Sequence, residues 1–489
     1  MPDLMYRVFL PLGLALGGLY VLYHVLSGSA SSQIYLVVGG FIGLEILVMA
    51  LWNYRQRFLP VLMLVFLLAS LKVPFHTAWL AARWGVLAAG AIAGFVLFMK
   101  RSSQMERSSQ DFGTFHLVAF FAVIAAVVSA LVSALPSVAL LKTTSLLLVF
   151  LYGATGARLA IIGREAEFFA GVLRACEILV YVSAVSYFVF RYPLCGNPNS
   201  LGVLMGVVAA PVLVWGVIVS EGTKAYKRAT FALVLCLLLL LGSYARAAIG
   251  GACLSSVLLC GALRRYRLLL KGIAVALVAA FLMVAISPTR EPSSSGGLID
   301  KLTDTFLYKG TRARGLFGSR ESPWARTSAA IRDHRWFGTG FGTSVTTVEQ
   351  RPTDLDIESN HRSTRETANS YLEIVEWTGL LGVTPFFFLI LLTGINIGRA
   401  TLSIRRTCNA FSPAVPIAAV LAAGLFHALF EDWLFAVGYY MCVFFWVFAF
   451  ALVDVLPASE SASRAQVVSA PQIASHIWDG ADPAIAPSR

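Results

Sequence analysis

Apolar runs of membrane length recur along almost the whole 489-residue chain and constrain its fold more than any other feature. About 20 apolar residues suffice to cross the hydrocarbon core as an α-helix, which satisfies all its backbone hydrogen bonds internally. The chain is 58% hydrophobic and only 13% charged, with a mean hydropathy of +0.75, so a soluble class is excluded. We predict an all-α fold, a polytopic membrane helical bundle.

A scan with a window of about 20 residues finds the candidate spans. We expect about 12 to 14 transmembrane helices, because the third, ninth and tenth runs are short enough for one of them to be re-entrant. The candidate runs are 8–27, 34–52, 59–74, 78–98, 114–134, 139–162, 167–190, 200–220, 229–242, 247–262, 269–288, 370–398, 413–430 and 433–452.

One long polar segment, 287–368, interrupts this series and sets the domain organisation. We expect it to be a large loop containing short helices, and the tail, rich in Ala, Ser and Pro, to be disordered and cytoplasmic. The predicted units are N-terminal transmembrane helices at 1–190, further transmembrane helices at 191–288, the large loop at 289–368, C-terminal transmembrane helices at 369–452 and the tail at 453–489.

Basic residues cluster in the short loops and predict the orientation of the bundle. With a cytoplasmic N-terminus, every basic loop falls inside and the polar segment emerges outside. The net charge of +12 is therefore interpreted as a topology signal, and no nucleic-acid partner is expected. The basic short loops are 55–57, 100–107, 164, 224–228, 264–271 and 399–406.

The composition of the polar segment indicates anion recognition. A planar guanidinium can hold phosphate or carboxylate oxygens through two parallel hydrogen bonds, which an ammonium group cannot. Lysine appears in the segment only as Lys301 and Lys309, whereas ten arginines occur there. They are Arg290, Arg312, Arg314, Arg320, Arg326, Arg332, Arg335, Arg351, Arg362 and Arg365.

Within this loop the sequence predicts one amphipathic helix followed by a glycine-rich turn. Ser322 is a suitable N-cap for a helix that begins at Pro323 and ends at Gly338. Such a helix would lie on the membrane surface or over a cavity, although an ordinary surface helix with solvated charges is an equal alternative. The turn at 338–342 has amides that can approach a phosphate, but most such turns are only turns. Trp324, Ser328 and Ile331 share one predicted helix face, with Arg326 and Asp333 elsewhere.

Six short motifs in a fixed order resemble the O-antigen ligase and Wzy polymerase superfamily over about residues 190 to 450. In the polar loop they are the Arg-Glu-x-x-Trp helix starting at Arg320 and the (Asp)-His-x-x-x-Gly-x-Gly-x-Gly turn. The others are Gly196-Asn-Pro-Asn-Ser-Leu-Gly202, Ser243-Tyr-Ala-Arg246, Asn369-Ser-Tyr-Leu with its Glu376-x-x-Gly-Leu-Leu-Gly382 ending, and Phe430-Glu-Asp-Trp-Leu-Phe-Ala-Val-Gly438.

The resemblance implies a glycosyltransferase of the bacterial inner membrane with its active site facing the periplasm. Members transfer a glycan from undecaprenyl diphosphate to an acceptor hydroxyl with inversion, and need no nucleotide sugar or obligatory metal. The implied partners are an undecaprenyl diphosphate-linked glycan, an acceptor glycan or lipid A core, membrane lipids and a chain-length regulator. No cofactor or metal site is expected, and the seven cysteines encode neither a metal site nor a disulfide framework.

Three arginines are the candidates for holding the diphosphate. Arg246 is the first, because a permanent charge at headgroup depth is costly without a partner. Its alternative is snorkelling, or pairing with an acid such as Glu431 or Asp432. Arg320 matches the arginine that precedes the family's loop helix, and Arg191 is a membrane-edge arginine for which interfacial anchoring is an equal alternative.

The chain departs from the family at the general base, since Ala368 stands where members commonly carry a histidine. Glu366 and His361 are the replacement candidates, with His334 weaker, and a surface polar role is the alternative for each. Asn369, Tyr371 and Ser243 are the candidates for positioning substrate.

Glu376 lies two turns into a span, so we expect a structural pair or a polar cavity around it. Gly379 and Gly382 are expected to allow close helix packing.

The missing histidine and the 430–438 motif favour a polysaccharide polymerase over a ligase that transfers to lipid A core. A polysaccharide transporter or flippase is the alternative from another class. Transporters commonly show internal repeats and mid-membrane charges, whereas here the charges concentrate at the outer edge and in one loop.

Overall fold

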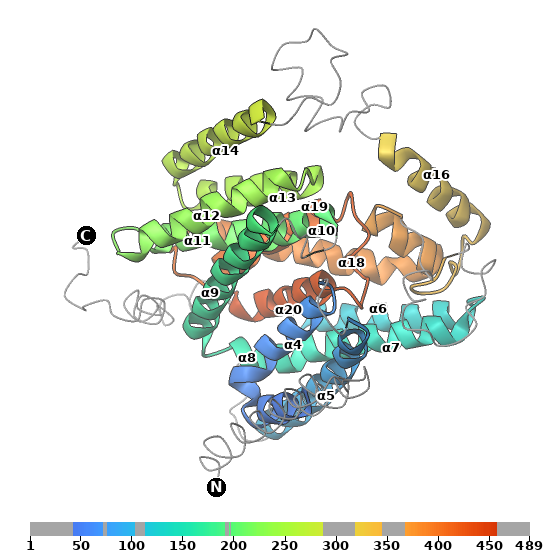
Figure 1. Ribbon diagram of the computed structural model, residues 1–489. Coiled ribbons are helices and arrows are strands. Elements are labelled where there is room, and N and C mark those ends of the chain that lie inside the picture. The colour runs from blue at the N-terminus through green and yellow to red at the C-terminus, as the bar shows by residue number, and fades with distance from the viewer. Residues whose placement is uncertain are drawn as a thin grey trace, which may run out of the picture.

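The structure is a computed structural model that describes residues 43–71, 76–102, 113–190, 195, 197–286, 318–344 and 367–456. In these ranges the chain forms helices joined by turns and short irregular segments, without a strand. The predicted all-α polytopic membrane bundle is therefore confirmed (Figure 1). The helices are α4 (Leu59–Leu68), α5 (His76–Ser102), α6 (Thr114–Leu131), α7 (Pro136–Tyr152), α8 (Arg158–Ile161), α9 (Glu165–Ala184), α10 (Pro198–Val203), α11 (Ala210–Val219), α12 (Ala225–Gly242), α13 (Arg246–Ala262), α14 (Tyr266–Ile286), α16 (Gly318–Asp333), α18 (Ser370–Thr407), α19 (Ala414–His427) and α20 (Tyr440–Val455).

Seven helices in the described ranges are long and apolar enough to cross a membrane. The long spans include wide π-helical turns where helices cross closely, as at η5 (Leu204–Ala209). There a Cβ on Gly206 would lie 2.5 Å from the carbonyl oxygen of Ala248, so only glycine permits this contact. The spans are Ala78–Lys100, Thr114–Leu131, Pro136–Ile161, Glu165–Val189, Pro198–Val219, Ala225–Gly242 and Ser370–Thr407, with shorter apolar helices at Gly43–Trp52, Arg246–Ala262, Ala414–His427 and Tyr440–Val455.

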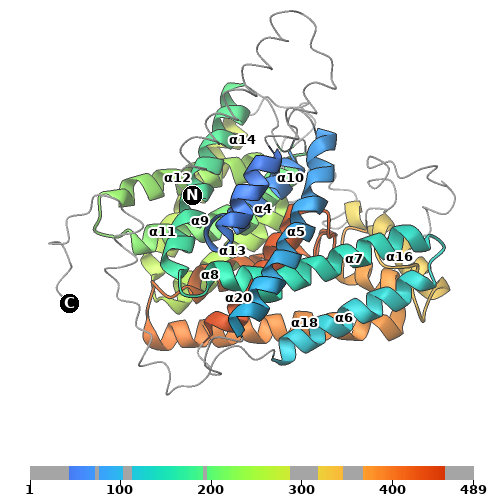
Figure 2. The same cartoon turned by 90° about the horizontal axis from the view of Figure 1, so that it is seen from below.

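The core lies around α11, α19 and α20, whose apolar side chains are buried almost all round. Large rings such as Trp215 and Trp446 are fully buried there. Helices nearer the outside of the bundle instead carry exposed apolar side chains on one side, as Phe120, Phe121 and Phe388 show on α6 and α18. These two helices run side by side (Figure 2). An exposed apolar face is what a lipid-facing helix requires.

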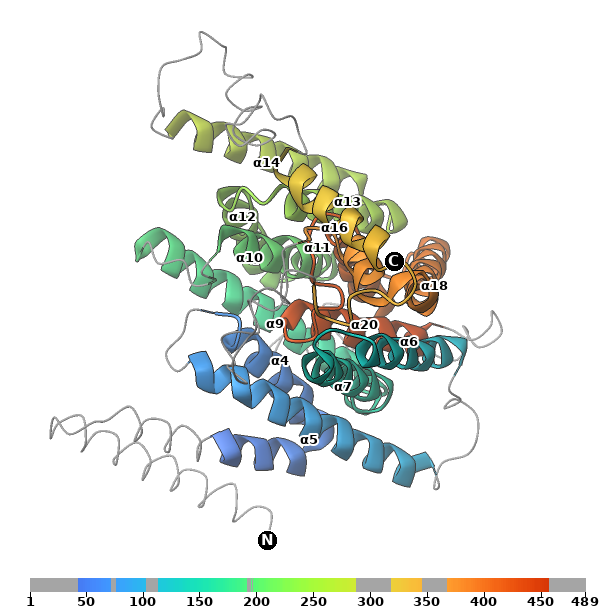
Figure 3. The same cartoon turned by 90° about the vertical axis from the view of Figure 1, so that its right-hand side faces the viewer.

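Two ends of the bundle can be distinguished from side-chain contacts. At one end, which we call the loop-bearing end, α16 lies across the ends of α13 and α18 (Figure 3). At the opposite end, three basic side chains are paired with acids: Arg228 and Arg265 from loops predicted to be cytoplasmic, and Arg158 from within the predicted span 139–162. Those pairs are Arg158–Asp454 at 2.7 Å, Arg228–Glu177 at 3.1 Å and Arg265–Glu221 at 2.8 Å.

Helix α18 differs from the predicted span 370–398, since it extends to Thr407 and is broken at Gly379. Gly379 has φ 65° and ψ −178°, a conformation that is essentially restricted to glycine. The amides of Leu380 and Leu381 donate to the carbonyl oxygens of Arg335 and Trp336, at 2.7 and 3.1 Å. Gly379 was expected to allow close helix packing. Instead it interrupts the helix, and the amides that follow it bind the loop.

The last predicted span, 433–452, begins too early, because α20 starts at Tyr440. Residues 428–439 form an irregular segment between α19 and α20, buried in part and with Leu429 exposed, which we call the re-entrant segment. Irregular backbone among apolar helices needs hydrogen-bond partners from its surroundings. Ser370, Arg83 and Trp446 supply them, the last two donating to the carbonyl oxygens of Gly438 (2.7 Å) and Leu434 (2.8 Å).

Candidate functional site

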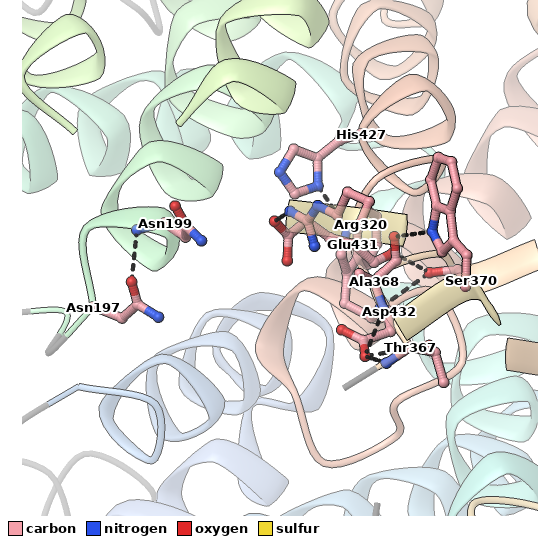
Figure 4. A network of polar contacts seen from close by, with 11 residues as sticks. Asn197, Asn199, Arg320, Thr367, Ala368, Ser370, His427, Glu431 and Asp432 are labelled. Atoms are coloured by element: carbon pink, nitrogen blue, oxygen red, sulfur yellow. Dashed lines mark hydrogen bonds and ion pairs between the residues drawn. The ribbon is translucent and has the colours of Figure 1, made fainter. Parts of the chain in front are cut away.

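Ser370, the first residue of α18, holds the re-entrant segment in place. Its hydroxyl donates to the carbonyl oxygen of Glu431 at 2.7 Å and accepts from the amides of Trp433 and Leu434 at 3.0 and 3.1 Å. Its own amide donates to the carbonyl oxygens of Ala428 (2.9 Å) and Glu431 (3.1 Å). Two motifs separated by about sixty residues therefore form one rigid unit (Figure 4).

Asp432 fixes the residues immediately before α18. One carboxylate oxygen accepts from the amide of Thr367 (2.7 Å), the hydroxyl of Thr367 (3.3 Å) and the amide of Ala368 (3.3 Å). Ala368 is fully buried with φ 56°, a left-handed conformation that is uncommon for alanine. Asp432 therefore stabilises an unfavourable turn at the position of the family's histidine.

Asn369 and Tyr371, both predicted to position substrate, make internal contacts. Asn369 caps α18, because its Oδ1 accepts from the amides of Tyr371 and Leu372 at 2.9 and 3.1 Å. The hydroxyl of Tyr371 donates to the carbonyl oxygen of Leu425 at 2.8 Å. Both residues thus shape the site by fixing its backbone.

Arg320 comes from α16 and reaches the re-entrant segment. Its Nη2 lies 2.5 Å from Oε1 of Glu431, and the two side chains are only 16% and 19% exposed. On the same helix, the indole nitrogen of Trp324 donates to the carbonyl oxygen of Ala368 at 3.3 Å. The loop helix is therefore docked over the start of α18 (Figure 4).

The predicted helix boundaries in the loop are wrong at both ends, since the helix ends at Asp333 and not at Gly338. The helix α16 begins at Gly318, so Ser322 does not cap it and Pro323 lies inside it. The predicted amphipathic face agrees with the burial, since Trp324, Ser328 and Ile331 are half-buried, whereas Arg326 and Asp333 are exposed. Four residues before Ser322 simply add another turn at the N-terminus, a boundary that local sequence defines poorly.

Arg246 is the first residue of α13 and follows a tight turn. Tyr244 has φ 52°, and the hydroxyl of Ser243 donates to the carbonyl oxygen of Leu240 (2.6 Å) and accepts from the amide of Ala245 (3.2 Å). A Cβ on Gly202 would lie 2.2 Å from the Cβ of Ala245, so α10 packs tightly against this turn. Ser243 thus fixes the place from which Arg246 projects.

Arg246 and Arg320 interact electrostatically, although their helices are far apart in the sequence. Arg320 also pairs with Glu431, and we call these three residues the arginine–glutamate cluster. The cluster carries two positive charges and one negative charge at the loop-bearing end. A partly enclosed positive site of this kind favours an anionic ligand, since fewer waters screen it there.

The glycine-rich turn at 338–342 is used for packing. Its amides at Thr339 and Gly340 donate to the carbonyl oxygens of Glu376 (2.9 Å) and Trp377 (3.1 Å). Lys142 Nζ donates to the carbonyl oxygen of Gly342 at 2.5 Å. With these amides occupied inside the protein, the phosphate-approach interpretation is wrong for Thr339 and Gly340.

A buried group of ionisable side chains beneath the site includes residues that the sequence analysis did not single out. The side chain of Glu373 is 3% exposed and interacts electrostatically with Asp432, Glu376 and Lys142. This supports the expected polar surroundings of Glu376, which is itself fully buried. Glu373 lies one helical turn before Glu376, and this spacing was the sequence signal that could have identified it. Lys142 comes from a distant helix and carried no such signal.

Three of the predicted site residues fall outside the part of the chain that the structure describes. Arg191, His361 and Glu366 lie outside the described residues. In the part of the chain that the structure describes, no three His, Cys, Asp or Glu side chains converge to hold a metal ion.

A family comparison identifies the domain that contains this site. Residues 231–387 match the model of the O-antigen ligase family. This segment contains Arg246, α16 and the first half of α18, whereas the re-entrant segment lies beyond it. A search of curated proteins found no match to the chain. The chain is therefore a polytopic membrane protein whose residues 231–387 match the O-antigen ligase family, in agreement with the resemblance of its motifs.

Proposed function

We propose that the chain is a glycosyltransferase that moves a glycan from undecaprenyl diphosphate onto an acceptor hydroxyl. The reaction takes place at the periplasmic face of the bacterial inner membrane, and the product is a longer lipid-linked polysaccharide. The observation that carries this proposal is the electrostatic interaction of Arg246 with Arg320, from two separate helices, the second of which also pairs with Glu431.

The leaving group explains why two arginines would be brought together. Negative charge builds on the diphosphate as its bond to the sugar breaks, and guanidinium groups can stabilise that charge without a metal. A single displacement by the acceptor oxygen inverts the anomeric centre. In this proposal Arg191 is a third diphosphate contact. The site is fixed by Ser243, Asn369 and Tyr371. The acceptor hydroxyl is activated by Glu366 or His361. A chain-length regulator is a further proposed partner.

A ligase that transfers to lipid A core is the second candidate, because the matching family model bears that description. The two activities share a donor site and differ in the acceptor. The missing histidine at Ala368 supports the polymerase, and so the acceptor must be tested directly.

The test uses purified protein in lipid nanodiscs with an undecaprenyl diphosphate-linked repeat unit, with and without lipid A core. A ladder of longer lipid-linked glycans from the donor alone supports a polymerase. Product that requires lipid A core supports a ligase instead, and no transfer to either acceptor contradicts the proposal and returns the transporter to consideration.

Arg246→Ala tests the diphosphate role. Loss of one group that stabilises developing charge should lower kcat about 10²- to 10³-fold. Arg326→Ala is the matched control, because Arg326 is an exposed arginine on α16 and should leave the rate unchanged. Equal activity of the two variants would refute the role of Arg246.

A further inference from the structure

The residues around Ala368 indicate a general base other than the loop candidates Glu366 and His361. Residues 367–370 are tied to the re-entrant segment by the contacts of Asp432 and Ser370. The backbone of Glu431 is therefore held against Ser370, two residues after the position of the missing histidine, and its side chain pairs with Arg320. We propose that Glu431 is the catalytic base that takes the acceptor proton, an inference that rests on the glycosyl transfer proposed above.

The other ionisable groups nearby are less suited to this role. Asp432 already accepts three hydrogen bonds on one oxygen and holds the Ala368 turn. His427 is 1% exposed, and its Nδ1 accepts from the indole nitrogen of Trp433 at 2.8 Å. Glu373 is 3% exposed beneath the site, whereas the Glu431 side chain keeps 19% of its surface in contact with solvent.

Glu431 and a diphosphate would compete for the same guanidinium. In the structure Arg320 is paired with Glu431, which balances one of the two positive charges in the cluster. A diphosphate that binds Arg246 and Arg320 would replace this carboxylate as the partner of Arg320. The displaced carboxylate then lies beside a new anion, which increases its affinity for a proton.

The chemical step follows from this exchange. The acceptor oxygen forms a bond to the anomeric carbon while the bond from that carbon to the diphosphate oxygen breaks. The hydroxyl proton passes to the Glu431 carboxylate, and the electron pair of the broken bond leaves with undecaprenyl diphosphate. When the diphosphate departs, Glu431 loses its proton to water and pairs with Arg320 again.

Glu431→Gln tests the proposal in nanodiscs with the donor described above. Chain extension should fall about 10²- to 10⁴-fold, the usual contribution of a general base. Undecaprenyl diphosphate should bind this variant as tightly as wild type or more tightly, because the competing charge is gone. Glu321→Gln, an exposed acid on the same loop helix as Arg320, should behave as wild type.

Chemical rescue separates a base from a structural partner. Formate added to Glu431→Ala should restore part of the rate, since a small carboxylate can occupy the vacated volume. Full activity in Glu431→Gln overturns the proposal, and loss of activity in Glu366→Gln or His361→Ala would then place the base in the loop. Loss of undecaprenyl diphosphate binding in Glu431→Gln, or no formate rescue of Glu431→Ala, also overturns it. Absence of glycan transfer by wild type would instead refute the proposed function itself.

Discussion

Replacing Ser370 by alanine tests the interlock between α18 and the re-entrant segment. The side chain of Ser370 is fully buried, and its hydroxyl is the recorded acceptor for the amides of Trp433 and Leu434. A buried donor left without a partner costs about 1–3 kcal/mol. Two such amides predict a loss of about 2–6 kcal/mol in the free energy of unfolding.

Ser145→Ala is the matched control for this variant. Ser145 is also buried, but its hydroxyl donates to the carbonyl oxygen of Leu141 one turn earlier in its own helix. That carbonyl also lies where the helix supplies an amide donor, so the control should change stability by only about 0.5 kcal/mol.

Unfolding by SDS in mixed micelles measures both variants against wild type. Backbone amide exchange at Trp433 and Leu434 should rise in Ser370→Ala, because these two groups lose their acceptor. The reasoning would be refuted by a stability difference between the two variants below about 1 kcal/mol, or by unchanged exchange at both amides.

Two further predictions concern the break in α18 and the opposite end of the bundle. In Gly379→Ala, the new Cβ would lie 2.4 Å from the carbonyl carbon of Trp336, and the backbone conformation alone costs about 1–3 kcal/mol. Thermal unfolding should therefore show a large loss of stability. The control Gly398→Ala, on the same helix, meets no neighbour and should match wild type. Equal stability of the two variants would contradict the proposed strain at Gly379. Asp454→Asn should lower the free energy of unfolding by about 3–5 kcal/mol, because it leaves the buried Arg158 without its acid. Undecaprenyl diphosphate should still bind unchanged. Weakened binding would argue against placing this pair and the candidate site at opposite ends of the bundle.

The boundaries that the sequence predicted well are those determined locally. Span α6, predicted at 114–134 and found at Thr114–Leu131, needs only an apolar run of sufficient length. The face of α16 that carries Trp324 also follows from helical periodicity alone. Errors occurred where one segment depends on another, as at Gly379, whose backbone is dictated by Arg335 and Trp336.

The sequence by itself determined the class of the protein, the positions of most spans, the family resemblance and two arginines worth testing. These follow from hydropathy and short motifs, which are properties of contiguous residues. Only the tertiary structure decided that the backbone of Glu431 is bound to Ser370 and that its side chain pairs with Arg320. These contacts join residues that are 61 and 111 positions apart in the sequence. Local sequence does not determine which buried polar groups will pair with one another.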